Sequence, residues 1–479
     1  MSDKKTRYIT TTLPYVNDEP HIGHALEFIE ADTLARYWRL LGYEVFFNTG
    51  TDEHGQKIAQ KADEAGQDRQ AYVNRYAERF RSLKNTLNLS FDAFIRTTSE
   101  AHKAAAQEIW KRCDEAGDIY KKKYTGLYCV GCEMFLRDSD LVAGNCPNHP
   151  NRKPEEVEEE NYFFAMSKYQ DRLIEYLKKD FSVVPEWQRT WAIDFIKSGL
   201  EDLSISREKS RMDWGIPVPG DDNHVMYVWF DALTNYISTL GWPEEGGDFE
   251  KFWVNGETLQ LAGKDQVRFQ SIIFQAMLLS AGIKNTDRIM YHGFINSGGQ
   301  KMSKSIGNVI SPYELVERYG VDATRYILLR HVHPVDDSDL TWKKMDGYYT
   351  DNLVNGLGNL VARVMKMAEM HLDVPIEKPE ASDFTQEYTE ALASYDFMTA
   401  CDYVWKKVSE LDEKITETEP FKLVKEDKEA GKKIIAELAH ELYIVARLLG
   451  PIMPEANVII KEAVLANKKP KNLFARLEM

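Results

Sequence analysis

The fold is decided by residues 13–24, which read LPYVNDEPHIGH. A strand-like run, residues 8–12, precedes this stretch, and a long helical pattern follows it. A strand that leads into a helix brings unpaired N–H groups and the positive end of the helix dipole to the junction. His21 and His24 lie three residues apart on the first turn, and Gly23 leaves room beside them for a ligand. The junction therefore favours phosphate binding, although a histidine-bearing turn without any ligand fits these residues equally well.

A parallel sheet is predicted for the first part of the chain. A strand pattern at residues 43–48 follows the first helix and leads into the turn 49–55. Strand–helix–strand order is typical of a parallel sheet, whose ligands bind beyond the carboxyl ends of the strands. Asp52 lies at such an end, so we expect it to reach the crevice that holds His21 and His24. An aspartate that only caps the next helix is the alternative interpretation.

The composition is that of a globular protein. With 479 residues, the chain is long enough for roughly three domains. No run approaches the ~18 apolar residues of a membrane span, so we expect no membrane partner. Five cysteines, three of them clustered, favour a reducing, cytoplasmic setting over a disulfide framework. The net charge of −16 argues mildly against a nucleic-acid partner, although a local basic face would be enough to bind one.

The clustered cysteines form a pattern typical of a metal site. Four soft ligands occur as two short-spaced pairs with thirteen residues between them: Cys129 with Cys132, and Cys146 with His149. Three thiolates and one imidazole complete tetrahedral Zn²⁺ and leave no open position, which predicts a structural site with one zinc ion per chain. A chance cluster is the alternative. Cys113 and Cys401 lie outside the pattern, and we expect them to be small buried hydrophobic residues.

Residues 118–222 are predicted to form an inserted module that carries this zinc knuckle. The acidic run 155–160 indicates a solvated strand or a linker, and helical patterns cover residues 165–179 and 191–203. Three tryptophans of the module are expected in the core rather than at a ligand: Trp187, Trp191 and Trp214.

The parallel sheet is expected to resume after the insertion, with strands at residues 225–231, 258–262 and 288–291. The second of these strands runs into Gly263, Lys264 and Asp265, which a helix follows. An aspartate at such a junction suits a ribose hydroxyl, and the backbone there suits phosphate oxygens. The tripeptide is a weak signal by itself, and a structural turn explains it equally well.

Residues 298–308, GGQKMSKSIGN, predict a mobile loop that closes over a polyanion. Lys301 and Lys304 lie three residues apart, and glycines flank them on both sides. Lysine offers a compact positive charge, which suits phosphate oxygens as charge develops on them during group transfer. The spacing is not that of a P-loop. A basic surface loop without a ligand is the simpler alternative.

The chain from about residue 346 reads as helices separated by polar loops. A helix over residues 351–370 carries an apolar stripe: Leu353, Leu357, Leu360, Val364 and Met367. A second face holds amide and guanidinium groups: Asn352, Asn355, Asn359 and Arg363. Such groups can read unpaired bases, although interhelical hydrogen bonds explain them equally well. With further helices near 385–414 and 431–449, the segment predicts a helical bundle.

Two of these stretches together resemble the signatures of class I aminoacyl-tRNA synthetases: residues 21–24, HIGH, and residues 301–305, KMSKS. Three further stretches narrow the resemblance to the methionyl-tRNA synthetases: residues 12–15, TLPY, residues 49–55, TGTDEHG, and residues 227–232, YVWFDA. The similarity runs from residue 6 to near the C-terminus, and the cysteine–histidine spacing resembles that of the single-knuckle zinc type.

The resemblance implies an α/β fold, with a Rossmann-like parallel sheet split by a zinc-bearing insertion and followed by a C-terminal α-helical bundle. The implied parts are a first catalytic half, a connective domain with the zinc knuckle, a second catalytic half, a lysine-loop linking region and an anticodon-binding bundle: residues 1–117, 118–222, 223–295, 296–348 and 349–479. No further tRNA-binding and dimerising domain follows in this sequence, so a monomer is expected.

The resemblance also implies a two-step reaction. L-Methionine attacks the α-phosphate of Mg²⁺-bound ATP, and the methionyl group of the resulting adenylate then moves to the terminal adenosine of tRNA(Met), initiator tRNA included. The residues implied for ATP are His21, Gly23, His24, Asp265, Lys301 and Lys304, of which the histidines and lysines act in catalysis. The residues implied for methionine are Leu13, Tyr15, Asp52, Trp229, Ala232, Tyr236 and Gln270. The implied anticodon contacts are Asn359, Arg363 and Phe421.

Four positions depart from the family pattern. Gln266 and Gln270 replace an aliphatic residue and a histidine of the methionine pocket, and Leu233 replaces a proline. Phe421 replaces a tryptophan that stacks on an anticodon base, so a weaker contact is expected. These departures leave two alternatives open: a class I synthetase for another amino acid, such as cysteine or leucine, and a catalytically silent tRNA-binding paralogue.

Overall fold

The computed structural model describes residues 5–130, 134–136, 138–147, 153–302, 307–380 and 384–477. The chain divides into two compact units. Unit 1 comprises Met1–Glu19, Tyr43–Ser82 and Phe91–Tyr291, and unit 2 comprises Pro20–Gly42, Leu83–Ser90 and His292–Met479. The five-part division implied by the sequence is finer than this and stays a prediction. None of the helices in the described ranges is both long and apolar enough to span a membrane.

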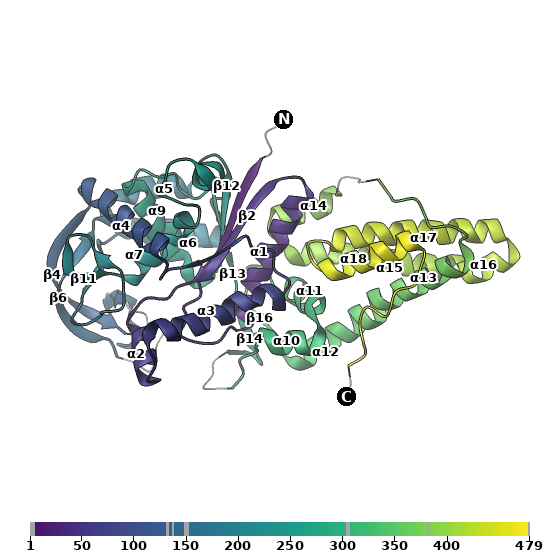
Figure 1. The fold of residues 1–479 in the computed structure, drawn as a ribbon, viewed down its shortest axis with the longest axis horizontal. Helices are drawn as coiled ribbons and strands as arrows, with labels where there is room; N and C mark the ends of the chain where they lie inside the picture. Colours follow the sequence, from purple (N-terminus) through teal and green to yellow (C-terminus); the bar gives the residue numbers. More distant parts are fainter. Residues whose placement is uncertain are drawn as a thin grey trace. The chain divides into compact units, whose positions relative to one another are not determined.

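A six-stranded sheet with the order β3-β2-β1-β12-β13-β7 forms the centre of unit 1 (Figure 1). Its strands are β1 (Thr6–Thr11), β2 (Glu44–Thr51), β3 (Ala93–Arg96), β7 (Val183–Val184), β12 (Glu257–Gly263) and β13 (Arg288–His292). β1 pairs in parallel with β2 and with β12, β2 pairs in parallel with β3, and β13 pairs in parallel with β7. The predicted parallel sheet is therefore confirmed, and strands from both sides of the insertion are neighbours in it.

Aromatic and aliphatic side chains bury one face of this sheet. Tyr8 of β1 is fully buried, and its ring packs against Phe46 of β2 and against Trp253. α4 (Glu100–Glu115) and α9 (Gln275–Ser280) add Ile109 and Met277 to the same core. Each such side chain contributes about 1.5–3 kcal/mol by leaving water, which fixes the helices on the sheet.

The segment predicted to be an insertion has its own antiparallel sheet with the order β5-β4-β6-β8, although its strand β7 joins the parallel sheet. Its strands are β4 (Ile119–Cys129), β5 (Met134–Leu136), β6 (Glu155–Phe164) and β8 (Leu203–Ser204). The acidic run of the sequence is the first part of β6, where exposed and buried positions alternate. Two helices follow in the module, α5 (Gln170–Leu177) and α6 (Glu186–Lys197). The predicted helix 191–203 was therefore placed too late, because the chain already turns into α6 after Pro185 and leaves it before Gly199, whose φ is +105°.

The prediction that the parallel sheet resumes at residue 225 is wrong. β11 (Asp221–Met226) pairs in antiparallel fashion with β9 (Ser206–Glu208) and β10 (Pro217–Val218), in a separate three-stranded sheet. The chain then turns into the short helices α7 (Val228–Ala232) and α8 (Asn235–Ser238). An apolar run of this length fits a strand or a buried helix, and here the partner strands of β11 decide where the strand ends.

Unit 2 begins with α1 (Ile22–Leu40) and ends in a helical bundle (Figure 1). Between them lie a small sheet with the order β15-β14-β16, and the helices α10 (Pro312–Tyr319), α11 (Val321–His331) and α12 (Trp342–Tyr348). The sheet consists of β14 (Ile295–Ser297), β15 (Gln300–Lys301) and β16 (Ser338–Asp339). The bundle contains α13 (Asn359–His371), α14 (Gln386–Ala393), α15 (Phe397–Thr418), α16 (Pro420–Glu426), α17 (Lys428–Leu449) and α18 (Pro454–Ala466).

The predicted apolar stripe of residues 351–370 is confirmed, because all five of its residues are buried. The regular helical spacing of the second, polar face is wrong in its first part. Tyr349–Gly358 form a π-helix, η6, whose turns are wider than those of an α-helix. The predicted helix 385–414 is also two helices, α14 and α15, which separate near Tyr395, where φ is +63°.

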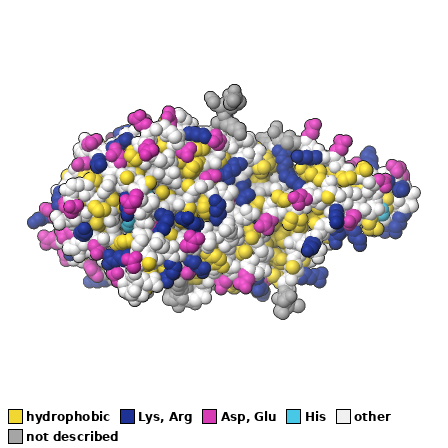
Figure 2. Space-filling view, viewed as in Figure 1, with side chains coloured by type: hydrophobic (Ala, Val, Ile, Leu, Met, Phe, Trp, Pro, Cys, Tyr) yellow, Lys and Arg dark blue, Asp and Glu magenta, His cyan; other side chains and the backbone are white. Residues whose placement is uncertain are grey.

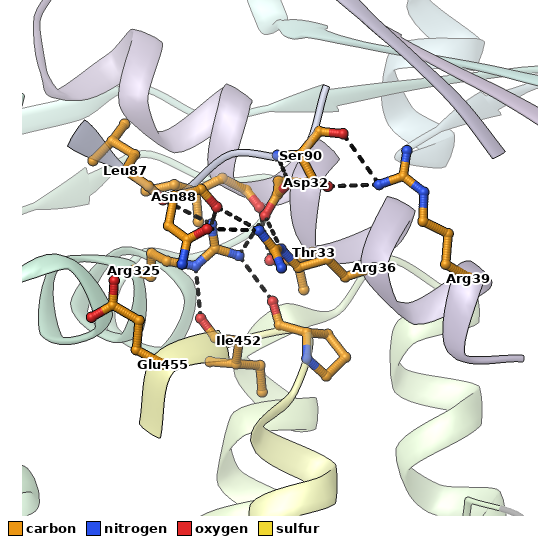
Figure 3. Close-up of polar contacts among 12 residues, drawn as sticks. Asp32, Thr33, Arg36, Arg39, Leu87, Asn88, Ser90, Arg325, Ile452 and Glu455 are labelled. Atoms are coloured by element: carbon orange, nitrogen blue, oxygen red, sulfur yellow. Dashed lines mark hydrogen bonds and ion pairs between the residues drawn. The ribbon is translucent and has the colours of Figure 1, made fainter. Parts of the chain in front are cut away.

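A buried ion pair anchors α1 inside unit 2 (Figure 3). Arg325 of α11 and Asp32 of α1 are both fully buried, and Arg325 Nη2 lies 2.8 Å from Asp32 Oδ2. The same guanidinium donates to the carbonyl oxygens of Ile452, Pro451 and Leu87 at 2.9–3.2 Å. One side chain therefore joins α1, α11, the turn after α3 (Arg69–Thr86) and the segment before α18.

Candidate active site

α1 begins at a histidine cap. His21 is the N-cap residue, and its backbone is extended, with φ −128° and ψ 173°. The backbone N–H of Gly23 donates to His21 Nδ1 at 3.1 Å, and the backbone N–H of His21 donates to His24 Nδ1 at 3.2 Å. The two rings are stacked, with centroids 3.8 Å apart. A Cβ atom on Gly23 would lie 3.0 Å from His21 Cε1, so the glycine lets the first ring fold back over the turn.

These hydrogen bonds fix the protons of both imidazoles. Because each Nδ1 accepts a hydrogen bond, the proton of each neutral ring lies on Nε2. Burial lowers the pKa of His24 well below its usual value, and the neighbouring His21 and His292 lower it further. His24 is therefore neutral near pH 7, and its proton lies on Nε2.

The first turn differs in one respect from the sequence prediction. Its backbone N–H groups were expected to bind phosphate, but that of Ile22 donates to the Ile310 carbonyl at 2.9 Å, and that of Gly23 donates to His21. The first two N–H groups of the turn are therefore already hydrogen-bonded within the chain. An anion at this helix start would therefore be held by the two Nε2–H groups and by the helix dipole.

A buried charge cluster lies further along α1, at Glu27 and Glu30. His292 Nδ1 donates to the Gly293 carbonyl at 2.8 Å, and its Nε2 donates to Glu27 Oε2 at 3.1 Å. Because both ring nitrogens face acceptors, the ring carries two protons and a positive charge. Burial opposes this charge, but the hydrogen bond to Glu27 and the carboxyl groups of Glu30 and Glu27 raise the pKa of His292 to about 9. Burial raises the pKa of Glu30 to about 8, although the charge of His292 opposes this rise.

The cluster predicts how the stability of unit 2 depends on pH. His292 and Glu30 hold a proton more tightly in the folded chain than in the unfolded chain, where their pKa values are 6.5 and 4.5. Stability from such groups is fully present below the unfolded pKa and is lost as the pH rises through the folded pKa. The free energy of unfolding should therefore fall between about pH 5 and 9, by up to about 1.4 kcal/mol per pH unit for each group.

Glu30→Gln tests this expectation, because the amide keeps the shape of the carboxyl and does not titrate. In the variant, the free energy of unfolding should fall less steeply between about pH 5 and 8, because the contribution of Glu30 is gone. Guanidinium chloride unfolding at several pH values measures this. Glu413→Gln, at an exposed position of α15, is the matched control and should keep the wild-type slope. An unchanged slope in Glu30→Gln would mean that Glu30 is ionised in the folded chain.

The lysine loop starts from a tight hairpin in unit 2. β14 and β15 are joined by Gly298 and Gly299, whose φ values of +64° and +73° favour glycine. Lys301 is exposed, and its Nζ lies 5.3 Å from the centroid of the Phe294 ring. Lys304 lies outside the described residues, so its position next to Lys301 at a phosphate stays a prediction.

In unit 1, the structure brings Asp52 next to the stretch that precedes the histidines. Tyr15 and Asp52 form a parallel bridge, in which the N–H of Val16 donates to the Asp52 carbonyl and the N–H of Asp52 donates to the Pro14 carbonyl. Asp52 is 6% exposed. Leu13 and Tyr15 are half-buried beside it. Because the two histidines belong to unit 2, their predicted meeting with Asp52 stays a prediction.

The remaining methionine-pocket candidates lie on short helices of unit 1. Trp229 is half-buried on α7 and stacks on Phe269, with ring centroids 3.8 Å apart. Ala232 and Tyr236 are buried, and Tyr236 Oη accepts a hydrogen bond from Gln270 Nε2 at 2.6 Å. The departures Gln270 and Leu233 are thus both buried, whereas Gln266 is half-buried and donates to the exposed Asp265 at 3.0 Å.

Two buried polar atoms of this group have no hydrogen-bond partner among the described residues: Trp229 Nε1 and Gln270 Oε1. A buried polar atom without a partner costs about 1–3 kcal/mol, so a bound molecule that satisfies it gains the same amount. The two atoms therefore favour a ligand or water at α7 and Gln270.

Sequence reasoning missed a buried network that holds these elements together. Asp231 of α7 is fully buried, and its two carboxylate oxygens accept hydrogen bonds from His54 Nδ1 at 2.7 Å and His102 Nε2 at 2.8 Å. Burial would raise the pKa of Asp231, but the two imidazoles hold it below its usual value. The network fixes the turn after Asp52 against the helix that carries Trp229. His54 and Asp231 both lie in stretches singled out in the sequence, but no spacing signal connects residues so far apart.

Only half of the predicted zinc ligands can be placed. Cys129 and Cys146 are 2% and 1% exposed, and they pack in one small cluster with Leu136. Cys132 and His149 lie outside the described residues. The two cysteines outside the pattern, Cys113 and Cys401, are fully buried, as predicted, and burial raises the pKa of the Cys113 thiol to about 12.

The anticodon candidates lie on the bundle of unit 2. Asn359 is exposed at the start of α13, and Arg363 is half-buried one turn later, where its Nη1 contacts Asp412 Oδ1. Phe421 is 42% exposed on α16, and Lys422 Nζ lies 6.0 Å from its ring centroid. These positions leave an aromatic ring and an amide open to a partner.

Comparison with known proteins identifies the family. The model of the family described as tRNA synthetases class I (M) matches residues 7–156 and 149–365. Among curated proteins, the methionine–tRNA ligase of Caldanaerobacter subterraneus is 42% identical, over 99% of this chain and 74% of that protein. The methionine–tRNA ligase of Fusobacterium nucleatum is 39% identical, over 98% of this chain and 76% of its own length.

Solved structures agree with these relatives. The methionyl-tRNA synthetase of Mycobacterium tuberculosis in complex with methionyl-adenylate has a TM-score of 0.88 and 35% sequence identity, and the match covers 99% of this chain and 98% of that one. The free-state form of the same enzyme has a TM-score of 0.83 and 31% identity, with 99% of both chains covered. The identity and the coverage exceed what a shared fold alone would give. The chain therefore belongs to the class I methionyl-tRNA synthetases, the ligases that join methionine to tRNA.

Proposed function

We propose that this chain activates L-methionine with Mg²⁺-bound ATP and then transfers the methionyl group to the 3′ end of tRNA(Met), initiator tRNA included. The observation that carries the proposal is the stacked pair His21 and His24, whose Nε2 protons are fixed by hydrogen bonds to Nδ1. Two preorganised donors at the positive end of a helix suit the phosphates of ATP.

The first step needs positioning and charge stabilisation, and it needs no covalent nucleophile on the enzyme. A carboxylate oxygen of methionine attacks the α-phosphorus, and the bond to the leaving pyrophosphate breaks. His21 and His24 donate to phosphate oxygens beside Gly23, Lys301 and Lys304 neutralise the charge that develops on the leaving group, and Asp265 accepts from a ribose hydroxyl. In the second step, a ribose hydroxyl of the terminal adenosine attacks the methionyl carbonyl carbon, and AMP leaves.

Asp52 binds the methionine ammonium group in this proposal. Its carboxylate is nearly buried, so an ion pair with the ammonium is stronger than it would be in water. Leu13, Tyr15, Trp229, Ala232 and Tyr236 form the apolar and aromatic wall that a thioether needs. Gln270 acts by holding the Tyr236 hydroxyl, which explains how the pocket keeps its shape without the histidine that the family has at this position.

Asn359, Arg363 and Phe421 read the anticodon in this proposal. The amide and the guanidinium donate to base edges, and the exposed ring of Phe421 stacks on an unpaired base. Lysine and arginine side chains are interspersed with the acidic ones on the face drawn in Figure 2, so the net charge of −16 does not make that face uniformly acidic.

A structural Zn²⁺ ion, one per chain, is proposed for Cys129, Cys132, Cys146 and His149. The burial of Cys129 and Cys146 in one cluster supports this assignment, because it brings together one member of each predicted pair of zinc ligands. The ion would supply a crosslink that folds the tip of the inserted module and would take no part in the reaction.

Cys146→Ser should lower the zinc content from about one ion per chain to well below half, because a hydroxyl is a poor zinc ligand. Atomic absorption after dialysis measures the content. Cys113→Ser, which changes a buried thiol outside the pattern, should keep its zinc. A full zinc content in the Cys146 variant would remove the site.

ATP–pyrophosphate exchange with each amino acid in turn, without tRNA, tests the pocket. Exchange with methionine alone is the expected result. Exchange with cysteine or leucine would mean that Gln266, Gln270 and Leu233 have changed the specificity, and no exchange with any amino acid would favour a tRNA-binding paralogue. A reducing, cytoplasmic setting is part of the proposal, because Cys113 and Cys401, which lie outside the zinc pattern, are free cysteines in the described part of the chain. We also propose that the chain is a monomer, and sedimentation equilibrium measures its oligomeric state.

A further inference from the structure

α6 of the inserted module carries two large aromatic side chains on its surface. Trp187 is 48% exposed and Trp191 is 45% exposed. The sequence prediction that both lie in the core is therefore wrong. The core-facing residues of α6 are instead Gln188, Ala192 and Ile196, which are buried. Leaving two indoles in water forfeits the burial that tryptophan normally gains, which points to a partner that covers them.

The exposed rings continue into an ordered stack. Trp187, Trp191 and Phe195 are spaced by four residues, so they lie along one side of the helix. The rings of Trp191 and Phe195 are stacked, with centroids 5.3 Å apart and an angle of 18° between the planes. The guanidinium carbon of Arg268 lies 5.1 Å from the centroid of the Phe195 ring. The stripe thus runs from open helix surface to the segment that follows Asp265.

α6 is also attached to that segment directly. Gln188, 4% exposed, donates through Nε2 to the carbonyl of Lys264 at 3.5 Å. Lys264 precedes Asp265, and Phe269 of the same segment stacks on Trp229. All of these residues belong to unit 1. The exposed tryptophans therefore lie on a helix that borders the residues proposed for the adenylate.

We propose that Trp187 and Trp191 form a stacking platform for the single-stranded 3′ end of tRNA. This inference rests on the proposed function, because methionyl transfer requires the terminal adenosine to reach the adenylate. The nucleotides that lead to it must then cross the surface around Lys264 and Asp265. Unpaired bases stack on exposed aromatic planes without regard to sequence, and guanidinium planes extend such stacks.

The charges around the stripe are compatible with a phosphate backbone. Lys264 and Arg268 carry positive charge on the segment that borders α6. Glu186 is the acidic residue at the start of the helix, and it pairs with Arg189 at 2.6 Å. Asp194 is the other acidic residue of α6. The alternative occupant of an aromatic surface is a second copy of this chain. A dimer interface does not require the stripe to border Lys264 and Asp265, whereas binding of the tRNA 3′ end does.

The test compares Trp187→Ala, Trp191→Ala and the double variant with the full-length wild type. We expect kcat/KM for tRNA in aminoacylation to fall about 10-fold in each single variant and about 100-fold in the double variant. Methionine-dependent ATP–pyrophosphate exchange, which needs no tRNA, should stay at the wild-type level in all three. Trp187→Phe and Trp191→Phe should restore most of the loss, because phenylalanine still stacks. A short single-stranded RNA ending in CCA should quench the tryptophan fluorescence of the wild type and not that of the double variant.

Phe181→Ala is the matched control, because Phe181 is 61% exposed in the same unit and lies outside the stripe. It should behave as wild type in both assays. Three results would overturn the platform: wild-type aminoacylation by the double variant, an equal loss of exchange and aminoacylation, or a change from dimer to monomer in the double variant with tRNA kinetics unchanged. Absence of methionine-dependent exchange in the wild type would instead overturn the proposed function, so the two failures are distinguishable.

Discussion

The Asp52→Asn variant is expected to lose about 100- to 1000-fold in kcat/KM for methionine in ATP–pyrophosphate exchange. Asp52 is 6% exposed, and its backbone is locked by hydrogen bonds with residues 14–16. The amide therefore stays where the carboxylate was, and water cannot take over its charge. The methionine ammonium group is left without a counter-charge in a site of low dielectric constant. An uncompensated buried charge is the main reason why breaking a buried ion pair is unfavourable.

Two measurements separate this effect from a loss of folding. The thermal midpoint of Asp52→Asn should stay within a few degrees of wild type, because the amide has the shape of the carboxylate and the backbone hydrogen bonds of residue 52 are unchanged. Glu64→Gln, at an exposed position of α2 (Gln56–Glu64), changes the net charge by the same amount and should keep wild-type exchange. A wild-type KM for methionine in Asp52→Asn would assign the ammonium to another group.

Local patterns in the sequence were sufficient for the parallel sheet and for part of the site. β1, β2, β12 and β13 are recognisable from their β-branched, aromatic and aliphatic residues, which are mostly buried because parallel strands are covered on both faces. Asp52 lies beside Tyr15 because the carboxyl ends of neighbouring parallel strands meet at one edge of the sheet, whereas its meeting with His21 and His24 stays a prediction. In these cases the deciding contacts are made by the backbone, whose geometry the pattern specifies.

Features decided by distant side chains could not be predicted in this way. Helical spacing places Trp187 and Trp191 on one face of α6, but the spacing does not say whether that face meets the core or the solvent. The end of β11 depends on β9 and β10, and the charge of His292 depends on Glu27, which is 265 residues away in the chain. Each of these outcomes departs from a local rule, and such departures concentrate at functional sites.

The Arg325→Met variant is expected to lower the free energy of unfolding of unit 2 by about 3–5 kcal/mol. Arg325 and Asp32 are both fully buried, and Asp32 also accepts from Arg36 Nε and from Ser90, each at 2.6 Å (Figure 3). Burial would raise the pKa of Asp32, but the two arginines and Ser90 hold it below its usual value. Methionine fills the volume of the arginine stem, yet it leaves the carboxylate with one cation fewer and removes the donors of three carbonyl groups.

Arg318→Met is the matched control for this loss, because Arg318 also pairs with an aspartate, Asp346, at 2.8 Å, but this pair lies partly in solvent. Arg318→Met should lower the free energy of unfolding by less than about 1 kcal/mol. In guanidinium chloride unfolding, the double variant Asp32→Asn with Arg325→Met should be more stable than the sum of its single variants predicts, because it leaves no unpaired charge in the interior. Equal losses for the Arg325 and Arg318 variants would contradict the expectation, since the buried pair would then be no more important than a surface one.

The large loss matters for function because Asp32 lies on α1, the helix whose first turn carries His21 and His24. An enzyme that uses these two imidazoles needs that helix held at a fixed place in its unit.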